Sequence, residues 1–201
     1  GGGNEEDIMM ITLKLSLLQG KNLGAGERAE DGGSAPWKTE PKVRVVVRSD
    51  PSFFMADKTL EGATEAETSL NPEFRTPATL RLRVRRPLDS DMLPVELQQT
   101  AMQASLAGMH LILTVVATDP SIVAAEGGSE EAAQVIVGSF ALSVDRLLES
   151  QAWKEKKLAQ FHENLTRNGK LNGRLSGCVE VADITTATGA PLKQSKGCVV
   201  S

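Results

Sequence analysis

Apolar and polar residues alternate in several short segments of the chain, which is the pattern of strands that bury one face. One such segment runs from Ile11 to Leu17, with Ile11, Leu13, Leu15 and Leu17 as its apolar series. Similar segments lie near 42–47, 80–85, 135–142 and 175–181, and 111–117 is a β-branched run suited to a central strand. Glycine, proline and serine separate these segments. The sequence therefore predicts an all-β fold, an antiparallel eight-stranded β-sandwich.

Two stretches depart from this alternation. Apolar residues recur at helical spacing over 91–106, and apolar residues are mixed with charges over 144–165, so short helical insertions are predicted in both. We expect an N-terminal tail over 1–7, one sandwich domain over 8–182 and a flexible tail over 183–201.

Composition narrows the classes of function. The 201 residues are 40% hydrophobic and 24% charged, which suits one domain with a real core. A net charge of −4, aromatic content of 3% and the absence of tyrosine argue against nucleic acid as a partner. Two cysteines give no disulfide framework, so a cytoplasmic protein is expected. No run is long and apolar enough to span a bilayer, so any membrane contact is expected to be peripheral.

The last four residues, Cys198-Val199-Val200-Ser201, match a prenylation box that farnesyltransferase recognises. The preceding stretch has no apolar periodicity and includes Lys193 and Lys196, so it is a linker that adds two positive charges. We predict that Cys198 carries a farnesyl group and brings the protein to the cytosolic face of a membrane. The alternative is an ordinary surface thiol in a frayed tail.

Five segments carry motifs in a fixed order: Leu13–Leu23, Glu40–Val45, Ser69–Phe74, Val115–Asp119 and Val135–Leu142. In this order they resemble the C2 domain, the lipid-binding β-sandwich of protein kinase C and the synaptotagmins. The Leu-Asn-Pro turn within Ser69–Phe74 is the most specific match. The likeness covers residues 9–181 and departs from the family in the long first loop and in the insertion before residue 110.

The resemblance also implies where calcium would bind, at aspartates of two loops. Here Glu40 and Ala117 replace two of those aspartates, Asp119 remains, and Asp31 is an uncertain counterpart in the first loop. Calcium needs six to eight oxygen ligands, so the sequence predicts a calcium-independent member with no cofactor. A weak calcium site stays open as an alternative.

Arginine occupies every second position of one predicted strand, at Arg81, Arg83 and Arg85, and Arg86 follows. These side chains, with Lys193 and Lys196, are the candidate contacts for anionic phospholipid. A structural interpretation, which the frequency of cross-strand charge pairs favours, is that the arginines pair across the sheet with the glutamates at 61, 65 and 67.

No catalytic arrangement is visible. His110 and His162 have no companion at metal-ligand spacing, and Cys178 fits a small buried strand residue. We therefore expect a non-enzymatic peripheral membrane adaptor that binds anionic lipid, a membrane-bound protein partner, or both. The alternatives are a calcium-independent scaffold domain without lipid binding and, third, a calcium-dependent phospholipid sensor.

Overall fold

The structure, a computed structural model, is dominated by antiparallel strands. It describes residues 8–25, 40–50, 61–85, 108–118, 133–149, 155, 158–186 and 189. Within these residues the elements are β1 (Ile8–Lys21), β2 (Lys42–Asp50), β3 (Glu61–Ala63), β4 (Glu67–Thr68), β5 (Ala78–Arg85), β6 (His110–Thr118), β7 (Gln134–Ser143), α4 (Val144–Glu149), β8 (Leu158–Arg167) and β9 (Lys170–Thr186).

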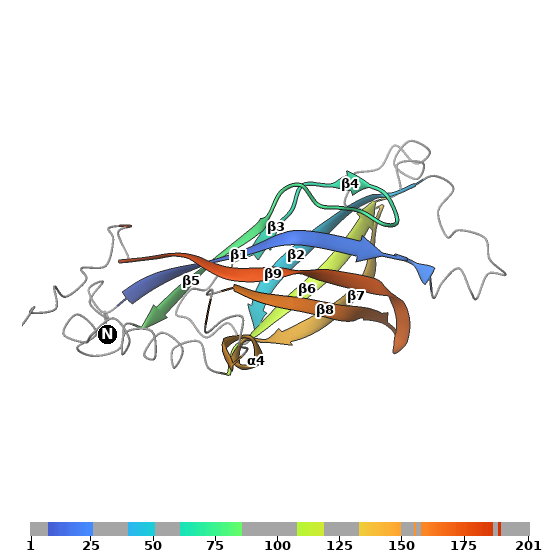
Figure 1. The fold of residues 1–201 in the computed structure, drawn as a ribbon. Helices are drawn as coiled ribbons and strands as arrows, with labels where there is room; N and C mark the ends of the chain where they lie inside the picture. The colour runs from blue at the N-terminus through green and yellow to red at the C-terminus, as the bar shows by residue number, and fades with distance from the viewer. Residues whose placement is uncertain are drawn as a thin grey trace, which may run out of the picture.

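Eight strands follow one path of pairing, in the order β3-β2-β6-β7-β8-β9-β1-β5, and the two-residue β4 pairs with β2 beside this path. The path folds into two layers, with β1, β9 and β8 crossing in front of β2, β6 and β7 (Figure 1). The predicted fold class, an all-β antiparallel sandwich with short helical insertions, is confirmed, with nine strands among the described residues where eight were expected.

One apolar core lies between the layers because alternate residues of each strand face inward. Val43, Val45 and Val47 of β2 are fully buried, and they lie opposite three equally buried residues of β6. Burial of a side chain of this size stabilises the fold by about 1.5–3 kcal/mol. The valine alternation that predicted this strand therefore corresponds to its core-facing side.

Two seams join the layers. At the β3–β5 seam the backbones approach so closely that a Cβ atom on Gly62 would lie 2.2 Å from the Thr79 carbonyl oxygen. At the β7–β8 seam the strands share a single register pair, Ser139 with Thr166. The sheet is thus nearly closed, tightly at one seam and loosely at the other.

The end of β1 differs from its predicted alternation. A register shift between Ser16 and Gln19 makes a β-bulge, so two residues of β1 oppose Gly177 of β9. Leu17 adopts a positive φ of 52° and is 74% exposed, whereas Leu18 is buried in the core. The expectation that Leu17 belongs to the buried series was wrong, because the bulge passes that role to the next residue.

Within the stretch 144–165, Val144–Glu149 form α4 and the residues from Leu158 onward belong to strand β8. Ala159, Phe161 and Leu165 are buried while the residues between them are largely exposed, a period-two pattern that the intervening charges obscure. The helix predicted over 91–106 lies outside the described residues. Strand β9 continues to Thr186, past the domain boundary expected at 182. Within the described part of the chain, no helix is long and apolar enough to cross a membrane.

Candidate functional site

Strand β5, at one end of the pairing order, carries arginine at alternate positions. Arg81 is exposed between two buried leucines of the core. Because successive residues of a strand face opposite sides, the positions of Arg83 and Arg85 fall on the same outer face as Arg81. Three of the predicted lipid-contact residues therefore share one face of one strand. Arg86 lies outside the described residues.

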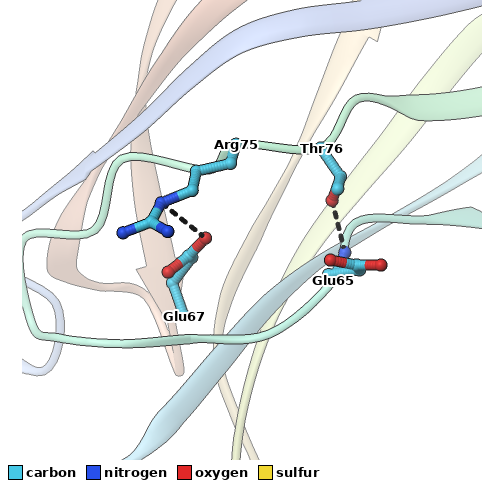
Figure 2. A network of polar contacts seen from close by, with 4 residues as sticks. All are labelled: Glu65, Glu67, Arg75 and Thr76. Atoms are coloured by element: carbon cyan, nitrogen blue, oxygen red, sulfur yellow. Dashed lines mark hydrogen bonds and ion pairs between the residues drawn. The ribbon is translucent and has the colours of Figure 1, made fainter.

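None of the glutamates proposed as partners of these arginines forms an ion pair with Arg81 among the described residues. Figure 2 shows Glu67 beside Arg75, with 3.8 Å between Oε1 and Nε, and the Glu65 backbone N–H donating to the Thr76 hydroxyl over 2.7 Å. Glu61 lies on β3 opposite Arg48.

Among the described residues the ion pairs are Glu67–Arg75 and Lys14–Glu180, and neither includes Arg81. The cross-sheet pairing suggested by the sequence is thus not formed at Arg81. Its charge is presented to solvent.

The arginine strand and the C-terminal end of β9 lie at the same end of the sandwich. Met10 of β1 is paired with Arg83 on one side and with Thr185 on the other. Neighbouring strands are about 4.8 Å apart, so the Arg83 and Thr185 backbones are separated by about 10 Å. Strand β9 thus ends beside the arginine strand, and Lys193, Lys196 and Cys198 lie outside the described residues.

The segment Ser69–Phe74, which carries the most specific motif, fastens the end of β1. The Gly20 N–H donates to the Pro72 carbonyl over 2.9 Å, and the Phe74 N–H donates to the Leu18 carbonyl over 2.9 Å. The Asn71 side chain accepts a hydrogen bond from the Asn22 N–H over 2.9 Å. This motif therefore has a structural role in holding the first loop to the sheet.

The positions that the C2 resemblance assigns to calcium do not form a cation site within the described residues. Glu40 is exposed just before β2, and Ala117 is fully buried in β6. Asp31 and Asp119 lie outside the described residues. Among the residues described, no group of three histidine, cysteine, aspartate or glutamate side chains could hold a metal ion.

Cys178 is a buried free thiol on β9. Burial raises the pKa of this thiol, and the negative charge of Glu180 raises it further. A thiol in such an environment stays protonated at neutral pH and is a poor nucleophile. His110 and His162 are exposed on separate strands, β6 and β8.

Comparison with known proteins leaves the family open. No protein-family model matches the chain, and no curated protein matches it. Among solved structures, CC2D1B, described as acting during the mitotic reformation of the nuclear envelope, is similar with a TM-score of 0.47 and 11% identity over 91% of this chain. Human GIVD cytosolic phospholipase A2 is similar with a TM-score of 0.44 and 11% identity over 88% of this chain.

The alignments span only 57% of the first protein and 18% of the second. Because both TM-scores lie below 0.5, the architecture described above rests on the strand pairing of this chain itself.

One surface was not predicted from the sequence. A groove of about 540 Å³ runs beside β7, between this strand and the turn that follows β8. Ile136 on its β7 wall is 55% exposed although it belongs to an apolar run. The alternation of Gln134 and Ile136 with Val135 was visible in the sequence. Their exposure depends on where β8 ends, which is a long-range property.

Proposed function

We propose that this protein is a non-enzymatic, C2-like peripheral membrane adaptor that binds anionic phospholipid through the β5 arginines and is anchored by a farnesyl group on Cys198. The observation that carries this proposal is the exposed Arg81, which joins no ion pair among the described residues and alternates with Arg83 and Arg85 on one strand. A cation near an anionic bilayer contributes about 1 kcal/mol. Two or three arginines on one face give useful but reversible affinity.

The anchor and the arginines support each other. A single lipid chain gives marginal attachment, so stable membrane residence needs a second signal. Eleven residues lie between Thr186 and Cys198, and an extended chain across these twelve steps reaches about 40 Å. A lipid on Cys198 can therefore enter the bilayer that the β5 arginines contact, and Lys193 and Lys196 add charge along the way.

Lipid binding is tested with the unprenylated full chain and vesicles that contain phosphatidylserine. Replacing Arg81 and Arg83 together by glutamine is expected to weaken vesicle binding by about 30-fold, the equivalent of two cations at about 1 kcal/mol each. The matched control replaces Lys42 and Arg48, two exposed cations of β2, by glutamine and is expected to have a much smaller effect. Equal losses of vesicle binding in both variants would mean that binding depends on net charge alone. That result would contradict a lipid site on β5.

The anchor is tested separately, by fractionation of eukaryotic cells that express the full chain or its Cys198→Ser variant. Mass spectrometry of the C-terminal peptide is expected to find farnesylated Cys198, and the variant is expected to lose membrane association. An unmodified Cys198 and identical distributions of the two proteins would overturn this half of the proposal and leave the lipid site to stand on the vesicle result.

The alternative function is a calcium-independent protein-interaction domain without intrinsic lipid binding. A wild-type chain that ignores anionic vesicles at low salt would favour it. Calorimetry with calcium separates the third candidate, because micromolar calcium binding would identify a calcium-dependent sensor.

A further inference from the structure

The β7–β8 seam leaves the first part of β7 without a neighbour on one side. Strand β7 pairs with β6 from Gln134 to Ser143, but with β8 only at Ser139. Strand β8 ends at Arg167, and the chain then turns back at Asn168 and Gly169, whose φ angles of 50° and 74° suit a two-residue hairpin turn. Gln134–Ile136 therefore extends past this hairpin, and no described strand lies along its outer edge.

The groove described above lies along this edge. Its β7 wall is formed by Gln134–Ile136 and Ser139, and its hairpin wall by Thr166–Asn168. An unpaired strand edge presents backbone donors and acceptors in a row and is a template for a further strand. Ile136, at 55% exposure, adds an apolar contact on the outer face.

Two cations of β2 lie on the outer face beside the groove. One row across the sheet runs from Ile136 of β7 through Val116 of β6 to Arg44 of β2. The other runs from Gln134 of β7 through Thr118 of β6 to Lys42 of β2. Arg44 and Lys42 therefore lie about 10 Å from the edge of β7, on its outer face. Neither cation joins the ion pairs found among the described residues, and neither row contains a carboxylate. Arg167 and Lys170 add positive charge at the hairpin.

We propose that this groove is the docking site for an extended, acidic segment of a protein partner, which adds as a strand to Gln134–Ile136 of β7. Backbone hydrogen bonds provide the pairing, an apolar side chain of the partner covers Ile136, and its carboxylates face Arg44 and Lys42. The site lies on the opposite half of the strand order from the β5 arginines, so it goes beyond the proposed lipid binding.

The probe is a synthetic acetylated and amidated peptide, Glu-Thr-Val-Thr-Glu-Thr, titrated into the full chain labelled with ¹⁵N. It is called the Glu-Val peptide because its glutamates and valine share one face of an extended strand, as Ile136, Arg44 and Lys42 do on the protein. Saturable shifts are expected at the amide signals of Gln134–Ser139 and Thr166–Asn168. A Lys-Val peptide of the same length is expected not to bind. The Glu-Val peptide with every second backbone nitrogen methylated is also expected not to bind, because its edge lacks the donors that strand addition needs.

The protein variant is Ile136→Glu, which removes the apolar contact and places a like charge opposite the peptide. It is expected to weaken binding at least about tenfold. Leu17→Glu is the matched control, since Leu17 is an exposed leucine of β1 on the other half of the sheet, and it is expected to leave binding unchanged.

Four results would overturn the proposal. These are no saturable binding of the Glu-Val peptide, shifts centred on β5, equal binding of the Lys-Val peptide, or full binding of the methylated peptide. Two further results would assign the surface to another occupant. A concentration-dependent dimer that Ile136→Glu abolishes would assign it to a second copy, and weakened vesicle binding in Ile136→Glu would assign it to the membrane.

Discussion

The two seams that close the sheet each contain a glycine, and they differ in how close the opposing backbone lies. At the β3–β5 seam a Cβ on Gly62 would meet the Thr79 carbonyl oxygen at 2.2 Å and its carbonyl carbon at 2.8 Å. At the β7–β8 seam a Cβ on Gly138 would meet the Leu165 Cβ at 3.0 Å and the Thr166 carbonyl oxygen at 3.1 Å. The first seam is shut by backbone contact, and the second is held by one strand pair and a few side chains.

This difference shows how a nearly closed sandwich can keep a binding edge. The β3–β5 seam is closed, and β5 presents the charge of Arg81 between two buried leucines. Charge on an edge strand discourages pairing with other chains. The β7–β8 seam ends early and leaves an edge with Ile136 beside it. Both candidate surfaces carry positive charge, and the edge of β7 with the exposed Ile136 beside it distinguishes the surface suited to a peptide strand.

Replacing Gly62 by alanine should break the tight seam and have the largest effect on stability. The new methyl group meets backbone atoms that cannot move without separating β3 from β5, so the free energy of unfolding is expected to fall by about 3 kcal/mol. Denaturant titration with an unchanged m-value measures this loss. A loss below about 1 kcal/mol would mean that the seam is looser than described.

Asn172→Ala should weaken the support of the loose seam. The Asn172 amide is buried and donates to the Val137 carbonyl over 2.7 Å, so its removal leaves a buried carbonyl without this donor at a cost of about 2 kcal/mol. Asn71→Ala is the matched control. It removes an exposed hydrogen bond and should cost less than about 1 kcal/mol. Equal losses in the two variants would contradict a special role for Asn172.

Gly138→Ala tests the β7–β8 seam for comparison with Gly62→Ala at the β3–β5 seam. The neighbours of Gly138 must shift by only a few tenths of an ångström, so the expected loss in unfolding free energy is about 1 kcal/mol. Thermal unfolding of the two alanine variants side by side ranks the seams. The ranking would be reversed if Gly138→Ala were the more damaging change.

The smallest effect on the free energy of unfolding is expected at Leu17, where the backbone of β1 is strained. Leu17 holds a positive φ that leucine disfavours, whereas asparagine tolerates it, so Leu17→Asn should raise the free energy of unfolding by up to about 1 kcal/mol. Leu171→Asn provides the control, since Leu171 is also exposed and has no positive φ. A similar gain in both variants would trace the effect to surface polarity rather than to the bulge.

Local alternation was enough to predict most strands. Strand β2 was predicted from the alternation of Val43, Val45 and Val47. The outer face of β5 was predicted from its arginine series. The alternation wrongly predicted that Leu17 is buried, because the bulge depends on Gly177, which is far away in the sequence. It also missed β8, whose charges resembled those of a helix.

The two candidate surfaces also differ in how far the local sequence predicts them. The exposure of Arg81 follows from its place in an alternating strand. The groove at Ile136 depends on the pairing order and on the length of the β8–β9 hairpin. Neither of these is a property of the residues around Ile136.

The position of β1 between β5 and β9 has a consequence for synthesis of the protein. At about 5–20 residues per second, β9 leaves the ribosome roughly ten to thirty seconds after β1. During that interval β1 can pair with β5 on one side only. Its other edge stays unpaired because β9 has not yet been synthesised. The sheet is completed by a contact between its earliest and latest described strands, so one edge of β1 is open to pairing with other chains until β9 arrives.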